Sequence, residues 1–573
     1  MARGSRWGAS ELVIETREGE ETRGQPDPPT HDERGRQLVW PAVVLVALGI
    51  AAIAFAEPLT DIAARVMPAA GEVRSHSHGF PSFRVAFPPM LRGLGAALLA
   101  AGATWIVAVR LQTHPRSHPA GGPLAPRIAL GALLVSAFGI YAWLAYPHNA
   151  GAGDALIHWV SILFGRREDF FYVLVKPLHW AFYDYPHVAQ GLLGVVNVSL
   201  MVSIGKRLLG GRWLPILMGA SLLASGTMLM RTDGSTDVQL NIACLLAVTL
   251  LYLRRSRFGV GAGIFLATLG RPMWVLFLVA FVAVEILFPR DAGEEGRPWM
   301  KAVLANRFLW ENLASFTILF VAWHAILGLM GIGWLLSDGE LIGKRPAFKR
   351  RPWLIDGFTI SRFSGTYLLH LLWVVPIPVV AASLYVWTRI RSLPRPKLKA
   401  FVFIWLFLAL ALALHEYLIF SGFTIKYLSY YVPLVIVTAW FAVSLPRPRG
   451  WTAAATGLTV LLALAPATAY QDAFSKRNER AAMPITELFA PRMSLQELAT
   501  DHMVATSLTK SHSRNYIAYV FRRPVLGKDG VIVIPQGVIP PDAVIVTNRP
   551  GWYERLPVLW HGDVMYVLGP TPG

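Results

Sequence analysis

Ionisable side chains are concentrated in one polar and aromatic segment, residues 147–185, which separates two apolar stretches. Carboxylates, cations and imidazoles grouped beside apolar sequence are typical of proton transfer or anion binding at a membrane surface. Asp154 follows two glycines that permit tight backbone turns, and we predict that it acts as a general base. The alternative is that Asp154 caps a short surface helix predicted from Ala155 onward. The other candidates in this segment are His158, Lys176 and His179.

Two further aspartates, Asp233 and Asp237, stand just before another apolar stretch. A second carboxylate near Asp154 would orient an acceptor hydroxyl. Its second possible role is to bind a divalent cation, such as Mg²⁺ or Mn²⁺, together with Asp154, because hard cations take oxygen ligands. The interpretation of Asp233 and Asp237 as helix caps is equally open. A divalent cation is therefore an optional cofactor, and no other cofactor is expected.

A later segment has the composition of a phosphate site, because arginine binds phosphate through its bidentate fork and lysine as a point charge. The predicted phosphate ligands are Lys176, Lys344, Arg345, Lys349, Arg350 and Lys426. His415 and Glu416 either pair with Lys426 or line the entrance to this site. We interpret Glu285 and His324, which also lie in apolar stretches, as structural residues.

The composition indicates that most of the chain is solvated by lipid. Of its 573 residues, 54% are hydrophobic, which exceeds what one soluble core can use. The predicted class is an all-α polytopic membrane protein. The net charge of +18 is dispersed in short clusters between apolar stretches, which argues against nucleic-acid binding. The only cysteine, Cys244, excludes an internal disulfide.

A helix needs roughly 20 apolar residues to cross a bilayer, and the candidate stretches predict about 11 to 13 transmembrane helices. They lie near 39–56, 88–109, 128–146, 187–204, 213–230, 238–253, 258–270, 273–288, 312–336, 366–388, 400–419, 427–445 and 451–469. The stretch 258–270 is too short to span alone, and we expect it to form a broken or tilted helix.

Lysine and arginine collect in alternate loops, which the positive-inside rule assigns to the cytoplasm. The amino terminus is then cytoplasmic, whereas the segment 147–185 and the chain after the last span are extracytoplasmic. The cationic segment 344–351 is an exception on the external side. It is either an anion site or the sign of a miscounted span.

Three regions follow from this reading. Residues 1–38 form a disordered cytoplasmic tail, 39–470 the transmembrane domain with a catalytic external loop at 147–185, and 471–573 a small extracytoplasmic α/β or β domain. Strand-like runs at 531–534, 543–547 and 564–568, separated by Gly and Pro turns, support the last assignment. Five polar and aromatic residues of this domain are candidates for contact with an acceptor glycan, but we favour their interpretation as an ordinary solvated face: Arg514, Tyr516, Arg549, Trp552 and Tyr553.

The order of these motifs resembles the GT-C superfamily of polyprenyl-phosphate-sugar-dependent glycosyltransferases, especially protein mannosyltransferases and aminoarabinose transferases. The resemblance covers about residues 127–573. It rests on Gly153-Asp154, on the run that begins Lys176-Pro177, on Asp233 or Asp237, and on Lys426-Tyr427 before Pro433. The chain departs from the family pattern at Val175 and Leu178. Two spans more than in the family pattern precede the acidic loop. Asp61, which follows the first span, is therefore the alternative to Asp154 as the family aspartate.

The resemblance implies a bacterial plasma-membrane enzyme that moves a sugar, with inversion, from a polyprenyl-phosphate donor to a glycan, lipid or protein acceptor. The residues fit this chemistry independently, because the leaving phosphate needs cations and the attacking hydroxyl needs a base. The alternatives are a transporter or lipid flippase without covalent chemistry, and a noncatalytic membrane scaffold. The absence of a visible repeat and the gathering of ionisable residues at one interface favour the enzyme.

Overall fold

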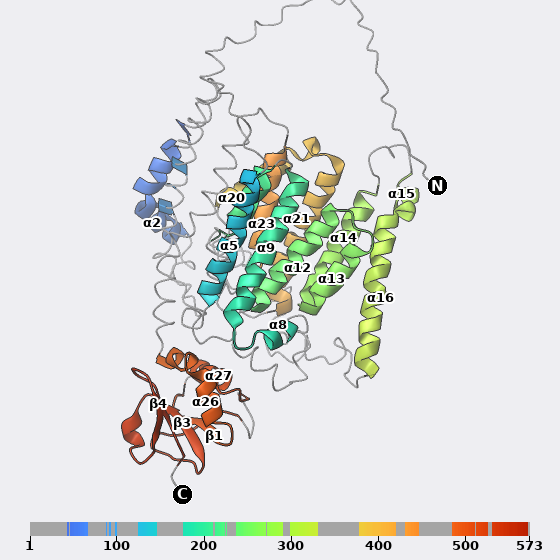
Figure 1. Ribbon diagram of the computed structural model, residues 1–573. Helices are drawn as coiled ribbons and strands as arrows, with labels where there is room; N and C mark the ends of the chain where they lie inside the picture. The colour runs from blue at the N-terminus through green and yellow to red at the C-terminus, as the bar shows by residue number, and fades with distance from the viewer. Residues whose placement is uncertain are drawn as a thin grey trace, which may run out of the picture.

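The computed structural model describes residues 43–66 apart from 45, a few residues between 88 and 99, and then 124–145, 176–209, 212–225 apart from 224, 236–270, 272–289, 298–329, 377–419, 430–445, 484–524 apart from 510, and 530–570. These residues form a helical bundle and a small C-terminal domain with one sheet (Figure 1). The expectation of a mostly helical chain with a small C-terminal domain is therefore met in the described segments.

The bundle helices run up and down between two ends of the molecule (Figure 1). They are α5 (Leu124–Ala145), α9 (Pro186–Leu208), α10 (Trp213–Leu223), α12 (Thr236–Leu253), α13 (Gly259–Gly270), α14 (Leu276–Leu287), α16 (Arg307–Leu329), α20 (Ile377–Thr388), α21 (Arg395–Ile419) and α23 (Val432–Trp440). Short connecting helices are α8 (Lys176–Ala181), η2 (Pro272–Val275), α15 (Trp299–Ala305), η4 (Ile390–Ser392) and η5 (Phe441–Ser444).

Among the described residues, three helices are long and apolar enough to cross a membrane: Leu124–Ala145, Pro186–Leu208 and Arg307–Ile326. This is fewer than the sequence predicts, and several other apolar helices are shorter. Local sequence explains the short helix α13, which was expected at 258–270: its 12 residues end at Gly270, and Pro272 then starts a 3-10 turn. Such a helix reaches only about 18 Å, against about 30 Å of hydrocarbon.

The first apolar stretch continues as a helix beyond its predicted end at residue 56, through α2 (Ala56–Val66). Apolar and polar residues alternate at helical spacing, with Glu57 in the first turn and Arg65 in the last, where each favours the helix dipole. Asp61, the alternative to Asp154, is an exposed residue of α2.

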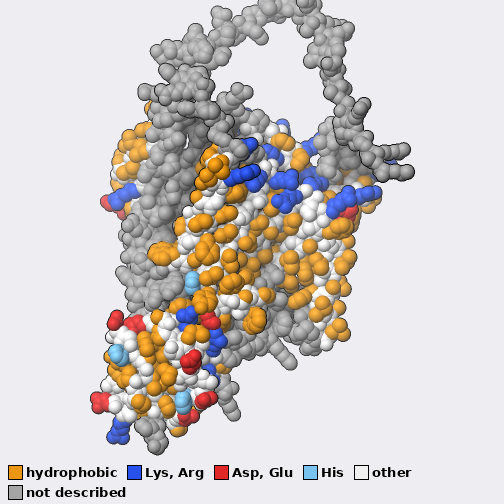
Figure 2. All heavy atoms as spheres, in the orientation of Figure 1, with side chains coloured by type: hydrophobic (Ala, Val, Ile, Leu, Met, Phe, Trp, Pro, Cys, Tyr) orange, Lys and Arg blue, Asp and Glu red, His pale blue; other side chains and the backbone are white. Residues whose placement is uncertain are grey.

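Aromatic rings fill the centre of the bundle. Tyr252 of α12 stacks on Phe403 of α21 with ring centroids 4.3 Å apart, and Phe277 of α14 stacks on Phe407 of α21 at 3.6 Å. The outward faces are also apolar, as in Ile318 of α16, which is 66% exposed (Figure 2). A bundle that is apolar both inside and outside is typical of a protein solvated by lipid.

Charged residues distinguish the two ends of the bundle. Figure 2 shows Lys and Arg side chains gathered along the end that lies away from the C-terminal domain. We call this end the basic rim, and its residues at helix ends include Lys206, Arg207, Arg212, Arg254, Arg257, Lys301, Arg307, Arg389, Arg391 and Arg395. Basic loops that are separated along the sequence therefore meet at one end of the molecule.

The C-terminal domain is an α/β unit with a five-stranded mixed sheet of order β2-β1-β3-β5-β4. The strands are β1 (Met503–Thr506), β2 (Ile532–Val533), β3 (Ala543–Thr547), β4 (Val558–His561) and β5 (Tyr566–Leu568). Strand β1 pairs in parallel with β2 and β3, while β5 pairs antiparallel with β3 and β4. Its helices are η6 (Pro484–Phe489), α26 (Arg492–Leu498), α27 (Ser511–Val520) and η7 (Pro550–Trp552).

The predicted strand 543–547 is confirmed as β3, and two other predicted runs contain the shorter strands β2 and β5. Strands β1 and β4 were not predicted. The interpretation of the tail aromatics as a solvated face is wrong for Tyr516 and Tyr553, which are both buried. Tyr553 packs with Ile545 in the apolar core on one face of the sheet, and Tyr516 belongs to the core under α27.

Candidate functional site

Most residues predicted to take part in chemistry lie outside the described residues. They are Asp154, His158, Asp233, Lys344, Arg345, Lys349, Arg350 and Lys426. For the remaining candidates the structure describes the backbone but not the side chain. Lys176 and His179 belong to α8, Asp237 is in the first turn of α12, and His415 with Glu416 lies near the end of α21. The roles of these residues stay predictions.

The described helix ends that carry Lys176, Asp237 and His415 all lie at the end of the bundle opposite the basic rim (Figure 1). Helix α16 also ends there, after starting at the rim. The C-terminal domain lies at this same end, next to α8.

The C-terminal domain contacts the turn between α8 and α9 through a reciprocal pair of tyrosines. The Tyr183 hydroxyl donates to the backbone oxygen of Tyr519 at 3.1 Å, and the Tyr519 hydroxyl donates to the backbone oxygen of Tyr183 at 2.7 Å. Burial raises the pKa of both phenols above the usual value, so each hydroxyl keeps the proton that it donates. The end of the predicted catalytic loop is thereby attached to the domain.

Charged contacts reinforce this attachment. The Asp184 carboxylate accepts from Arg522 at 2.7 Å, and Arg492 donates to the backbone oxygen of Asp184 at 2.9 Å. Arg522 follows α27 at a φ of 50°, in the left-handed position that usually holds glycine. The Arg523 amide donates to the Ala518 oxygen at 2.9 Å, which is the bond that defines a Schellman helix end.

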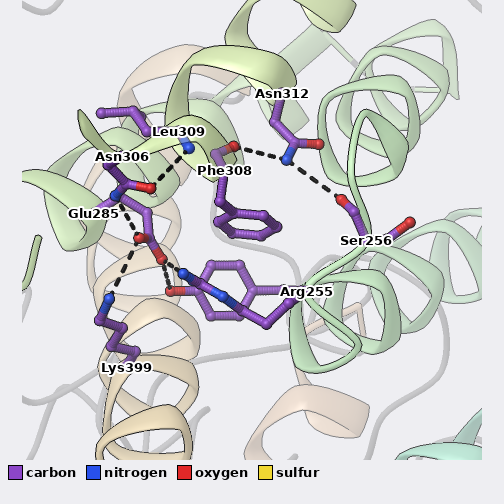
Figure 3. Close-up of polar contacts among 9 residues, drawn as sticks. Arg255, Ser256, Glu285, Asn306, Phe308, Leu309, Asn312 and Lys399 are labelled. Carbon is purple, nitrogen blue, oxygen red and sulfur yellow. Dashed lines mark hydrogen bonds and ion pairs between the residues drawn. The ribbon is translucent and has the colours of Figure 1, made fainter. Parts of the chain in front are cut away.

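A buried polar cluster surrounds Glu285 of α14 (Figure 3). Its Oε1 accepts from the Tyr252 hydroxyl at 2.7 Å and from Arg255 at 2.6 Å. Its Oε2 accepts from the Asn306 side chain at 2.9 Å and forms an ion pair with Lys399 at 3.5 Å. One carboxylate thus connects α12, α14, α21 and the junction between α15 and α16.

Arg255 repeats the arrangement seen at Arg522. It has a φ of 52° after α12, and the Ser256 amide donates to the Leu251 oxygen at 3.0 Å. Its guanidinium also lies over the Phe308 ring, 3.9 Å from the centroid (Figure 3). A left-handed arginine is strained by about 1 to 2 kcal/mol, and these contacts offset that strain.

Asn312 of α16 completes the polar contacts at this end. Its side-chain oxygen accepts from the Gly261 amide at 2.9 Å, and its amide donates to the Phe308 backbone oxygen at 2.9 Å. Both Glu285 oxygens are occupied by protein donors at the end of the bundle away from Asp237. These contacts agree with a structural role for Glu285, because both of its carboxylate oxygens already bind protein groups.

A second group of polar residues lies deep in the bundle. The Asn197 amide of α9 donates to the backbone oxygen of Gln239 at 3.1 Å and to its Oε1 at 2.9 Å. Gln190, also on α9, is buried, and neither of its side-chain polar atoms has a hydrogen-bond partner in the described part of the chain. These amides were not among the predicted site residues. The signal that could have revealed them is the helical spacing of Gln190 and Asn197 within an apolar stretch.

No group of three or more His, Cys, Asp or Glu side chains able to hold a metal ion occurs in the described part of the chain. Asp154, which the optional cation site requires, lies outside that part, so the prediction stays open. Comparison of the chain with protein-family models, with curated proteins and with solved structures gives no match. The resemblance to the GT-C superfamily therefore rests on the sequence motifs.

Proposed function

We propose that this protein is a membrane-embedded inverting glycosyltransferase of the GT-C type, which transfers a sugar from a polyprenyl-phosphate donor to an acceptor hydroxyl. The reaction takes place at the end of the bundle opposite the basic rim. In a bacterial plasma membrane this end is extracytoplasmic, because the positive-inside rule puts the rim in the cytoplasm.

One observation supports this proposal most directly. The helix ends that bear Lys176, Asp237, His415 and Glu416 share one end of the bundle with the C-terminal domain, although they are far apart in the sequence (Figure 1). A lipid phosphate lies at the membrane surface, so cations and carboxylates must meet near a helix end to act on it. The reciprocal tyrosine contact further joins the end of the acidic loop to the soluble domain.

The proposed step uses Asp154 as the base. The acceptor hydroxyl gives its proton to the Asp154 carboxylate as its oxygen bonds to the anomeric carbon. The bond between that carbon and the phosphate oxygen breaks, and polyprenyl phosphate leaves with the electron pair. Lys176 and the cations at 344–351 stabilise the developing negative charge. Attack opposite the leaving group inverts the anomeric centre.

The test uses purified full-length protein in lipid nanodiscs with a panel of labelled polyprenyl-phosphate sugars and sugar acceptors. We expect one donor to be consumed, with release of polyprenyl phosphate. Asp154→Asn should lower turnover by about 10²- to 10⁴-fold, the usual contribution of a general base. Its thermal unfolding should match that of the wild type.

The matched control is Glu311→Gln, the same loss of charge at the basic rim, where Glu311 lies 3.8 Å from Arg257. This variant should keep wild-type turnover. Unchanged turnover in Asp154→Asn would remove Asp154 from the mechanism, and Asp61→Asn would then test the alternative aspartate. Movement of the lipid across liposomes with no bond cleavage would instead favour a flippase.

A further inference from the structure

Three buried amide side chains in the bundle have polar atoms to which no described residue forms a hydrogen bond. Gln190 and Gln239 are 0% exposed, and Asn197 is 1% exposed. Both side-chain atoms of Gln190, the Asn197 Oδ1 and the Gln239 Nε2 have no hydrogen-bond partner among the described residues. Buried polar groups are normally paired, and an unpaired one destabilises the fold. Four such atoms on the packed helices α9 and α12 indicate a function that requires them.

The amides lie on the two packed helices α9 and α12. Gln190 and Asn197 lie on the same face of α9, about two helical turns apart. This face points to α12, where Gln239 accepts from Asn197 at 2.9 Å. Gln190 follows closely on Pro186, the first residue of α9, and Gln239 follows Asp237 in the first turns of α12. Gln190 and Gln239 therefore lie near the helix ends opposite the basic rim.

The free atoms include both donors and acceptors. Gln190 Nε2 and Gln239 Nε2 donate, whereas Gln190 Oε1 and Asn197 Oδ1 accept. An anion such as phosphate offers acceptors alone, and the two amide oxygens would repel it. A hydroxyl group both donates and accepts, so a ligand with several hydroxyls matches this set. The four atoms fit a neutral polyol better than an ion.

We infer that Gln190, Asn197 and Gln239 bind hydroxyl groups of the neutral sugar used in the proposed transfer. The inference rests on the proposed function and adds the recognition of the sugar to it. The amides are covered in this structure, so the sugar reaches them when the helix ends near Pro186 and Thr236 separate. The phosphate of the donor would stay at the mouth, near the cations.

The test measures binding of defined lipids to the full-length protein in nanodiscs. The probes are undecaprenyl phosphate and the same lipid carrying glucose, mannose or arabinose. The wild type should bind one of the sugar-bearing lipids more tightly than the bare lipid. Gln190→Leu keeps similar volume but has no hydrogen-bonding atoms, so it should reduce this preference by about tenfold. Its affinity for the bare lipid should not change.

Thermal unfolding of the unliganded variant separates recognition from a structural role. Gln190→Leu should keep or raise the unfolding temperature, because it removes an unpaired buried amide. Asn312→Leu is the control, and it should lower this temperature because its amide and oxygen are both hydrogen-bonded. A lower unfolding temperature for Gln190→Leu, with the sugar preference unchanged, would assign the amides to a structural water network and overturn the inference.

A methyl glycoside of each sugar identifies which substrate the amides recognise. Loss of binding to the sugar-bearing lipid in Gln190→Leu assigns them to the donor, and loss of binding to the free glycoside assigns them to the acceptor. An unchanged preference in a variant that retains turnover overturns this inference and leaves the proposed function standing. A wild type that prefers no sugar-bearing lipid and consumes none overturns both.

Discussion

Arg255 and Arg522 each occupy the left-handed position that ends a helix, with φ values of 52° and 50°. Glycine is the usual residue there because it has no Cβ to strain the backbone. Each arginine reaches from this position to a carboxylate on another element, Glu285 in one case and Asp184 in the other. The helix end thus projects the guanidinium across a packing interface. The strained backbone is compensated by the contact that it permits.

Replacement of Arg522 separates these two effects. Both Arg522→Ala and Arg522→Gly lose the pair with Asp184 and should accelerate proteolytic release of the C-terminal domain. The glycine variant relieves the left-handed strain, so its domain should be more stable to unfolding than that of the alanine variant by about 1 kcal/mol. Limited proteolysis and equilibrium unfolding provide the two measurements. Equal stability of the two variants would show that the left-handed backbone at residue 522 is not strained.

Glu285 provides a second prediction at this scale. Glu285→Leu leaves Lys399 buried without its carboxylate, and we expect a loss of about 3 to 5 kcal/mol in the free energy of unfolding in detergent. The double variant Glu285→Leu with Lys399→Met removes both buried charges and should recover much of that loss, because the third charge, Arg255, has a side chain that is 30% exposed and can turn toward water. If the double variant were as unstable as the sum of the single variants, the ion pair would not account for the effect.

Small residues determine how closely the helices approach one another. Gly191 and Gly194 of α9 face Phe138 and Tyr141 of α5, with no space for a side chain at either glycine. Gly261 of α13 lies against the backbone of α16 at Asn312. Close backbone contact of this kind is typical of helix packing in membranes, where dispersion forces and hydrogen bonds replace the hydrophobic effect. The bundle is therefore sensitive to size at these glycines.

Gly261→Ala tests this packing. The new Cβ would overlap the backbone oxygen of Asn312, so α13 and α16 would have to separate. We expect a loss of about 1 to 3 kcal/mol in the free energy of unfolding. Gly139→Ala in α5 is the matched control, because nothing lies within 4 Å of its Cβ. It should be neutral or stabilising by up to about 1 kcal/mol. Similar losses in both variants would point to a general effect of alanine instead.

The whole molecule has two chemically different ends. One end bears the basic rim, and the other is joined to the C-terminal domain through Tyr183, Asp184 and their partners (Figures 1 and 2). If the bundle crosses a membrane, the rim and the domain lie in different compartments. The proposed enzyme requires the domain on the extracytoplasmic side, because the positive-inside rule assigns the rim to the cytoplasm.

Cysteine labelling in intact cells checks this orientation. Cys244 is the only cysteine, so Cys244→Ala gives a background for single cysteines. A membrane-impermeant maleimide should label Glu554→Cys, exposed on the C-terminal domain, without permeabilisation. The Arg257 side chain at the rim is 72% exposed, and the maleimide should label Arg257→Cys only after the membrane is permeabilised. The reverse pattern would place the proposed site in the cytoplasm, and labelling of both in intact cells would contradict a spanning bundle.

Local patterns in the sequence determined the helical class, the short helix at 258–270 and the strand at 543–547. They also assigned Lys206, Arg254 and Arg389 to cytoplasmic loops, and the helix ends beside these residues lie at the same end of the bundle (Figure 1). These features were predictable because apolar content, glycine, proline and charge act over a few residues. Among the described residues, fewer helices are long enough to span a membrane than the sequence predicts, because apolar composition does not reveal where a helix ends.

Only the tertiary structure decided which distant residues are partners. It brought Arg255, Asn306 and Lys399 to Glu285, Tyr519 to Tyr183, and Gln239 to Asn197. It also paired β1 with β2 and β3, although the strand-like runs alone left the fold of the domain open. A buried hydrogen bond or ion pair depends on the positions of two backbones, and those positions arise from packing over the whole chain.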